Sequence, residues 1–298
     1  MINGIVNVYK EKGFTSFDAV AVMRGIFGTK KVGHTGTLDP DAEGVLPVCL
    51  GNATKLCDML TDKRKEYVAS FLLGKRTDTL DIWGTVLEEC EVGVSKEELE
   101  AAIKSFIGGY DQVPPMYSAK KVEGKKLCDL ARDGKVIERK PSFVEIFDIE
   151  ILENNPPAAT IKVTCGKGTY IRSLCADIGK KCGTFAVMTS LLRTRVSGFS
   201  LENAYKLSEL KELKEKGLLE SAVMPLDSVF SDIPKVQVTK EGERFLYNGN
   251  KMRADDFETL PENCKEIRVY DTSGEFKALY EYRAGEEIFA PKKMFLGV

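Results

Sequence analysis

The chain has 298 residues, of which 43% are hydrophobic and 30% charged, a composition typical of a globular protein with about two domains. Its formal net charge of −2 argues against a protein that coats nucleic acid non-specifically, because that task usually needs a strong positive field. No apolar run approaches the roughly 18 residues that span a bilayer, and the amino terminus lacks a signal-peptide pattern. We therefore expect a cytoplasmic protein.

The first half of the chain predicts strands and helices in alternation. Thr15-x-x-Asp18 is a capping-box start for a helix that Gly28 ends. The apolar residues of that helix at helical spacing are Phe17, Val20, Met23 and Phe27. The other elements expected in this half are a strand over 5–9, an apolar stretch over 45–50, a helix over 54–60, a strand over 67–73 with Tyr67, Ala69, Phe71 and Leu73 on one face, and a helix after Ser95 with Leu99, Ala102, Ile103 and Phe106 inward.

The second half predicts a further mixture of elements and a boundary. The expected elements are strands over 143–152 and 160–165, a helix with Ile171, Leu174, Cys175 and Ile178 inward, a polar helix over 208–219, a boundary over 225–234, and β segments over 266–270 and 276–280. Because strands and helices alternate without a regular βαβ rhythm, we expect an α+β protein with a mixed sheet and a small β-rich second domain.

Cofactor signatures are weak in this sequence. The eight cysteines include no C-x-x-C pair, and the single histidine, His34, excludes a multi-histidine metal cluster. A Ser-His-Asp triad could run only through His34. The Gly166-Lys167-Gly168-Thr169 turn lacks the four-residue spacer of a P-loop. We expect reduced thiols, no metal and no cofactor.

Residues 33–40 form the most informative segment, because small residues there surround one carboxylate and the only histidine. Gly33 and Gly36 allow positive φ or a close approach of the backbone to a ligand, and the Asp39-Pro40 pair favours a turn. The loop is suited to presenting Asp39, although an exposed Asp-Pro turn would explain the same pattern.

A second segment with a marked composition runs from Lys120 to Lys140. It contains eight lysines and arginines against four acidic residues, among them Glu123, for a local net charge of +4. Such a segment can face phosphates or can be an ordinary solvated surface. The lysines at its start are Lys120, Lys121, Lys125 and Lys126.

Five motifs occur in order along the chain: Gly33-His34-Thr35-Gly36-Thr37-Leu38-Asp39-Pro40, Lys65-Glu66-Tyr67, Arg76-Thr77-Asp78-Thr79-Leu80-Asp81, Met116-Tyr117-Ser118-Ala119 and Gly168-Thr169-Tyr170-Ile171-Arg172-Ser173-Leu174. Together they closely resemble the bacterial TruB family of tRNA pseudouridine synthases over most of residues 3–230. The ending Ala290-Pro291-Lys292-Lys293-Met294-Phe295 is similar to the small PUA-type RNA-binding domain of that family.

The resemblance implies isomerisation of the uridine at position 55, in the T-arm of tRNA, to pseudouridine without a metal or cofactor. It implies a catalytic domain over 1–231 with a mixed, largely antiparallel sheet, a basic RNA-gripping insertion over about 115–143, and a PUA-like domain over 232–298. It requires no obligate protein partner, no membrane and nothing larger than a monomer.

The resemblance also implies roles for particular residues. Asp39 is the catalytic residue, acting as a nucleophile at sugar or base or by removing a sugar proton. Arg172 would pair with it, and the other expected substrate contacts are His34, Tyr67, Tyr170, Leu191, Lys10 and Lys55. Glu11 departs from the family, which usually has proline after the lysine that matches Lys10. The alternative function is a tRNA-folding chaperone in which catalysis is secondary.

Overall fold

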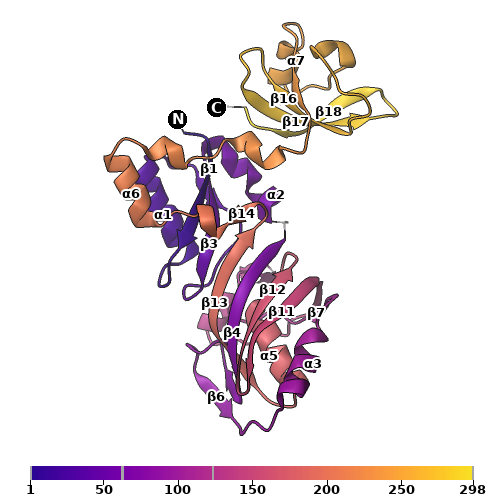
Figure 1. The fold of residues 1–298 in the computed structure, drawn as a ribbon. Coiled ribbons are helices and arrows are strands. Elements are labelled where there is room, and N and C mark those ends of the chain that lie inside the picture. Colours follow the sequence, from indigo (N-terminus) through magenta and orange to yellow (C-terminus); the bar gives the residue numbers. More distant parts are fainter. Residues whose placement is uncertain (1, 62–63, 123, 297–298) are drawn as a thin grey trace.

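A computed structural model of the chain describes residues 2–61, 64–122 and 124–296. The molecule is elongated, with a large sheet through its lower and middle parts and a separate group of C-terminal strands at the upper end (Figure 1). The order of strands along the large sheet is β1-β3-β13-β4-β12-β11.

The large sheet confirms the expected fold class. Its strands are β1 (Gly4–Lys10), β3 (Glu43–Leu50), β13 (Ala186–Val196), β4 (Lys65–Leu73), β12 (Ala158–Cys165) and β11 (Ile146–Asn155), with β2 (Val32–His34) paired to β3 and β14 (Phe199–Ser200) paired to β13. Strand β13 pairs with β3 in parallel, and the other four pairs on the path are antiparallel. The sheet is therefore mixed and largely antiparallel.

The parallel pair joins the two halves of the sheet through Gly44. Leu192 lies opposite Glu43, and Arg193 lies opposite Gly44. Gly44 has a φ of +106°, and a Cβ there would lie 2.2 Å from the carbonyl oxygen of Arg193. Because no side chain fits at that distance, glycine allows the close approach that brings the start of β3 beside β13.

Strand β13 was not predicted, although it lies in the middle of the sheet. Its register against β4 shifts twice, between Met188 and Ser190 and between Arg193 and Arg195. Each irregularity interrupts the alternation of inward and outward side chains that marks a strand in sequence. The neighbouring β4 is regular, and its predicted face of Tyr67, Ala69, Phe71 and Leu73 is buried as expected.

Seven α-helices accompany these strands in the part of the chain that the structure describes. They are α1 (Ser16–Phe27), α2 (Cys57–Thr61), α3 (Lys96–Lys104), α4 (Leu127–Arg132), α5 (Ile171–Lys181), α6 (Leu207–Glu215) and α7 (Glu243–Tyr247). The capping boxes of Thr15 and Ser95 and the left-handed cap at Gly28 are confirmed. Of the four apolar residues noted at helical spacing in α1, Phe17 is 67% exposed, and Ala19 and Ile26 complete the buried stripe instead.

Three two-stranded sheets accompany the large sheet, and a four-stranded sheet forms the C-terminal part. The two-stranded sheets are β5 (Lys75–Thr77) with β6 (Val86–Glu89), β7 (Tyr110–Gln112) with β10 (Ser142–Val144), and β8 (Lys121–Val122) with β9 (Lys125–Lys126). The C-terminal sheet contains β15 (Lys235–Gln237), β16 (Glu266–Tyr270), β17 (Phe276–Arg283) and β18 (Ile288–Met294). Phe230, Phe276 and Phe295 pack together where this sheet meets the rest of the chain.

Candidate active site

The backbone around Asp39 is held in a fixed turn between β2 and β3. Ser16 Oγ accepts a hydrogen bond from the Leu38 N–H (2.8 Å) and donates to the Leu38 carbonyl (3.1 Å). The Asp39 carbonyl accepts from the Ala42 N–H at 3.1 Å, which confirms the predicted Asp-Pro turn. Gly36 adopts a φ of +134°, as the sequence predicted for one of the two loop glycines.

Lys10 lies under this turn rather than in contact with a substrate site. The side chain is completely buried, and its Nζ donates to the carbonyls of Pro40 (3.0 Å) and Ala42 (2.6 Å). Burial lowers the pKa of Lys10 to about 8. The expected substrate contact is therefore corrected to a role in supporting the Asp39 loop. The backbone after Lys10 also contacts the loop, since the Gly13 N–H donates to Pro40 at 3.0 Å.

Arg172 holds the Asp39 carboxylate with two N–H groups. Arg172 Nε lies 2.9 Å from Asp39 Oδ2, and Arg172 Nη2 lies 3.1 Å from Asp39 Oδ1. The remaining donors are directed at backbone, with Nη1 at 2.9 Å from the Thr79 carbonyl and Nη2 at 2.7 Å from the Tyr117 carbonyl. The side chain of Arg172 is 6% exposed, whereas that of Asp39 is 38% exposed. The arginine is thus fixed, and the carboxylate it orients remains accessible.

A second carboxylate faces the same guanidinium. Asp81 Oδ2 lies 3.6 Å from Arg172 Nη1, and Thr79 Oγ1 donates to Asp81 Oδ1 at 2.6 Å. Burial raises the pKa of Asp81, while the Thr79 hydrogen bond and the Arg172 charge oppose that shift. Two carboxylates share one arginine, so the cluster carries a net negative charge when both are ionised.

Asp39 and Arg172 line a cavity of about 280 Å³ together with the predicted Tyr67, Tyr170 and Leu191. Tyr67 and Leu191 are 7% and 8% exposed and contribute apolar wall. Burial raises the pKa of Tyr67, so its phenol is neutral at ordinary pH. The cavity joins one charged pair to aromatic and aliphatic surface, a combination typical of small-molecule binding sites.

Tyr170 is positioned by a buried glutamine that the sequence analysis did not identify. The side-chain amide of Gln112 accepts from the Tyr170 N–H (2.8 Å) and donates to the Tyr170 carbonyl (3.0 Å). The amide thus forms the same pair of hydrogen bonds that the backbone of a neighbouring β-strand would form. Gln112 also donates to the Tyr110 hydroxyl, which donates to Asp177 on α5. This network fixes the backbone two residues before Arg172.

Three further cationic residues line the cavity and were also missed: Lys65, Lys167 and Arg193. Arg193 is fully buried on β13 and donates to the carbonyls of Val45 (2.7 Å) and Gly36 (3.1 Å). Lys65 precedes Tyr67 on β4 and is 8% exposed. The motif containing Lys65 was noticed in sequence, but Arg193 belongs to the strand that was not predicted.

His34 and Lys55 lie outside the residues that line the cavity. His34 ends β2, and its Nδ1 accepts from the Gly36 N–H at 3.2 Å. Lys55 Nζ donates to the Met294 carbonyl at 3.0 Å, so the lysine links the catalytic region to the C-terminal strands. The expected substrate contact of Lys55 and the expected RNA contact of His34 both stay predictions.

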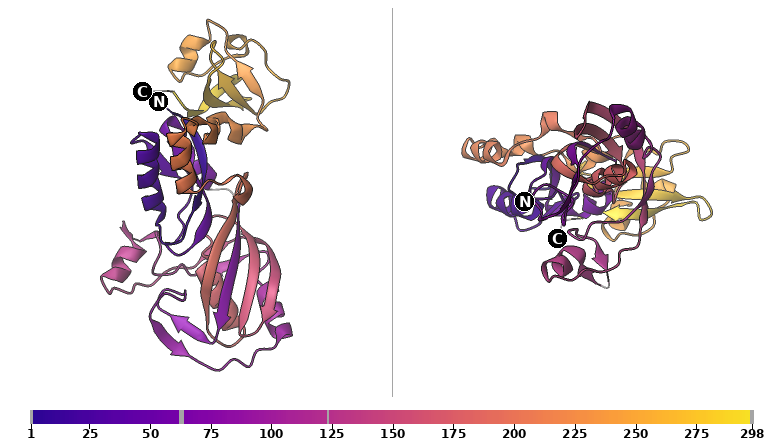
Figure 2. Two further views of the ribbon diagram at one scale, coloured as in Figure 1. Left: turned by 60° about the vertical axis from the view of Figure 1, so that its left-hand side comes forward. Right: turned by 90° about the horizontal axis from the view of Figure 1, so that it is seen from below.

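The basic segment projects from the body of the molecule around α4 (Figure 2). Lys121, Lys125 and Lys126 are exposed on the β8–β9 hairpin, and Lys120 is partly covered beside Ser142. Glu123, counted in the charge of this segment, lies outside the described residues.

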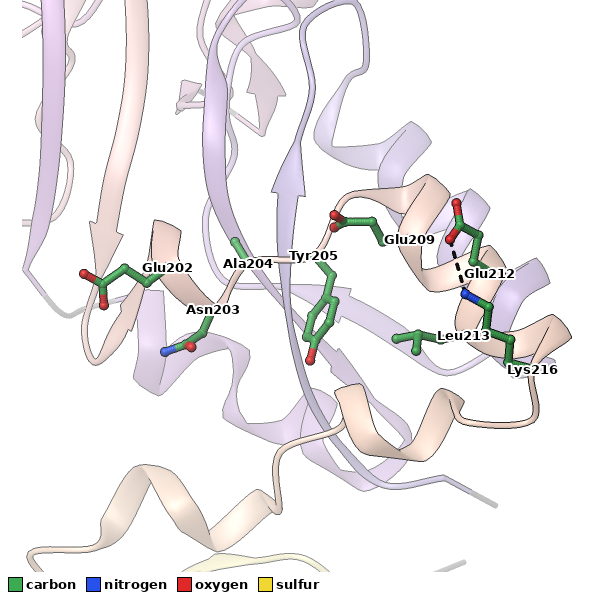
Figure 3. A pocket seen from close by; sticks show the side chains of 8 residues that line it. All are labelled: Glu202, Asn203, Ala204, Tyr205, Glu209, Glu212, Leu213 and Lys216. Carbon is green, nitrogen blue, oxygen red and sulfur yellow. Dashed lines mark ion pairs between the residues drawn. The ribbon is translucent and has the colours of Figure 1, made fainter.

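A larger hollow of about 400 Å³ lies beside α6 (Figure 3). Glu202, Glu209 and Glu212 line it, together with Lys216, whose Nζ lies 3.7 Å from Glu212. Its excess of carboxylates disfavours a polyanionic ligand, and none of the predicted site residues lines it.

All eight cysteines are free thiols. Within residues 2–61, 64–122 and 124–296, no three His, Cys, Asp or Glu side chains gather closely enough to hold a metal ion. None of the helices in that described part combines the length and apolarity that crossing a bilayer requires.

Comparisons with known proteins identify the family of this chain. Residues 24–171 match the TruB family pseudouridylate synthase N-terminal domain, and residues 172–231 match the tRNA pseudouridylate synthase B C-terminal domain. The tRNA pseudouridine synthase B of Lachnoclostridium phytofermentans is 52% identical, over 99% of this chain and all of its own length. That of Bacillus pumilus is 40% identical over 99% of this chain and 98% of its own.

A solved structure shares the whole fold. The matching chain of a Cbf5-Nop10-Gar1 complex superposes with a TM-score of 0.74 at 26% identity, covering 99% of this chain and 85% of its own. The fold and the site define a pseudouridine synthase, an isomerase. The chain belongs to the TruB family of pseudouridylate synthases, which confirms the resemblance found in the sequence.

The single histidine provides a pH-dependent test of this geometry. Burial, and then the charge of Arg193, lowers the pKa of His34 below its usual 6.5, and protonation would remove the acceptor used by Gly36. Below about pH 6.5 the unfolded chain binds a proton that the folded chain does not, so stability falls as the pH falls toward the folded pKa.

We expect one NMR titration, from the only imidazole, with a midpoint below 6.5. As the pH is lowered from 6.5 to that midpoint, the free energy of unfolding of the wild type should decrease more than that of His34→Gln. A midpoint at or above 6.5 would contradict the described environment of His34.

Proposed function

We propose that this enzyme converts the uridine at position 55, in the T-arm of tRNA, to pseudouridine. Relatives that are 40–52% identical bear the name tRNA pseudouridine synthase B, and the five motifs resemble that family along most of the chain. The observation that carries the proposal is the placement of Asp39, which faces a partly apolar cavity while Arg172 holds it with two N–H groups.

The reaction is an isomerisation, so its atoms and electrons balance within the substrate. The C1′–N1 bond of uridine breaks, the uracil turns, and a C1′–C5 bond forms; N1 gains a hydrogen and C5 loses one. Asp39 assists as a nucleophile at the sugar or the base, or by removing a sugar proton. Each route needs a carboxylate oxygen held toward the sugar or the base, and the two N–H groups of Arg172 fix that orientation.

The cavity walls suit an extruded base. Taking a uridine out of its stack costs a few kcal/mol, and stacking on an aromatic side chain recovers about 1–3 kcal/mol. In the proposal Tyr67 and Tyr170 provide aromatic surface and Leu191 an apolar wall. His34 contacts RNA or fills the gap that the extruded nucleotide leaves.

The rest of the chain binds the RNA around that nucleotide. Residues 1–231 form the catalytic domain, the insertion over about 115–143 grips the RNA backbone, and residues 232–298 form a PUA-like RNA-binding domain. The exposed lysines of the β8–β9 hairpin support the assignment of backbone contacts to the insertion. The enzyme works as a cytoplasmic monomer on tRNA without an obligate protein partner.

Replacing Asp39 by Asn removes the negative charge with little change in size. Pseudouridine formation in unmodified tRNA should fall by about 10³-fold or more, as for other essential catalytic groups. Conversion is measured by release of tritium from tRNA labelled at uridine C5, and binding is measured separately and should change little.

Undiminished conversion by Asp39→Asn would overturn the assigned catalytic role. The same variant separates the alternative function, because a protein that acts mainly as a folding chaperone would keep its full effect in a tRNA folding assay.

Replacing Lys125 and Lys126 together by Ala tests the basic hairpin. Binding of tRNA should weaken, and the slope of log affinity against log salt should become less steep by about 1–2, because two phosphate contacts are lost. The matched control replaces Lys96 and Lys104, which are exposed on α3. An unchanged salt slope in the hairpin variant would show that it is an ordinary solvated surface.

A further inference from the structure

The segment of residues 78–84, here the 78–84 loop, is held rigidly against the central strand. The Ile82 N–H donates to the Met188 carbonyl (2.9 Å), and the Met188 N–H donates to the Leu80 carbonyl (3.1 Å). Leu80 has a φ of +65°, a conformation that a leucine rarely adopts. A strained backbone held by surrounding hydrogen bonds is typical of a segment that presents a functional group.

One side of the loop already serves the active site through Asp81. Asp81 Oδ2 faces Arg172, whereas its Oδ1 accepts hydrogen bonds from Thr79 Oγ1 (2.6 Å) and from the Trp83 N–H (3.2 Å). The backbone of Trp83 is therefore tied to the cluster that orients Asp39.

The other side of the loop presents Trp83 to solvent. Trp83 is the only tryptophan of the chain, and it is 41% exposed. The Lys12 ammonium lies 4.7 Å from the centre of its ring, and Lys12 is itself exposed. An exposed indole with a cation over its ring offers partners for the two parts of a nucleotide, aromatic surface for a flat base and a positive charge for a phosphate.

A second connection links this pair to the Asp39 loop. Lys12 is adjacent to Gly13, whose N–H donates to the carbonyl of Pro40, the residue after Asp39. Trp83 does not line the cavity that contains Asp39. The pair thus lies next to the catalytic cavity and outside it.

We propose that Trp83 and Lys12 bind the nucleotide that flanks the extruded uridine. The base of that nucleotide stacks on the indole, and the Lys12 ammonium contacts its phosphate. This inference rests on the proposed function, since it assumes that an RNA strand delivers a uridine to Asp39. Because the 78–84 loop carries both Asp81 and Trp83, one rigid segment orients the catalytic cluster and holds the strand at its entrance.

The single tryptophan makes a direct test possible. The wild-type protein is titrated with a T-arm stem–loop RNA while indole emission is recorded, and a stem duplex without the loop is the control. Emission should fall with the stem–loop and saturate at the affinity found by filter binding. Unchanged emission at saturating stem–loop RNA would overturn the inference.

Substitutions give an independent measurement. Trp83→Ala should raise the Kd for the stem–loop about tenfold, the effect expected for one stacked base, and Trp83→Phe should retain most of the affinity. Lys12→Gln should weaken binding and reduce its salt dependence. Leu87→Ala, an exposed apolar substitution on β6 of the same hairpin, is the control and should bind normally.

Equal affinity of Trp83→Ala and the wild type would overturn the proposal, as would equal weakening by Leu87→Ala. Pseudouridine at position 55 is assayed in parallel with the wild type. If pseudouridine forms while the indole emission does not change, only this inference fails. If no pseudouridine forms, the proposed function fails, whether or not the indole emission changes.

Discussion

The pairing of Arg172 with Asp39 is the interaction on which the rest of the site depends. Asp39 acts through its carboxylate oxygens, so the direction in which they point decides whether they reach the substrate. Two parallel N–H groups of Arg172 fix the plane of the carboxylate. Arg172 cannot turn away easily, because its other contacts are backbone carbonyls of Thr79 and Tyr117.

The fold brings four distant parts of the chain together at this pair, two of which carry Asp39 and Arg172 themselves. The Asp39 turn precedes β3, Arg172 lies in the first turn of α5, and Thr79 and Tyr117 come from two other loops. The parallel joint between β3 and β13 sets the turn beside the cavity, and the Gln112 amide fixes the start of α5. Much of the geometry of the site is thus backbone geometry, held by buried polar groups that do not face the cavity.

The sequence predicted the parts that depend on local patterns. Capping boxes, regular alternation in β4 and the glycine turn before α5 gave elements that the structure confirms, and the motifs contain part of the cavity lining, including Asp39, Tyr67 and Arg172. The prediction from sequence failed where tertiary contacts determine the position or role of a residue. Two bulges hid β13 and with it Arg193, and nothing local distinguishes a buried lysine such as Lys10 from one that contacts substrate. Gln112 was missed because its role depends on Tyr170, 58 residues further along the chain.

The most direct test of this account measures conversion and affinity separately in Arg172 variants. Under single-turnover conditions with T-arm RNA, Arg172→Ala should lower the rate of pseudouridine formation by about 10²–10³-fold while the Kd for RNA changes only modestly. Arg172→Lys should also be slow, because an ammonium cannot make two parallel N–H bonds to one carboxylate. A large rise in Kd with a normal rate of conversion would contradict the account, since Arg172 would then bind RNA rather than organise Asp39.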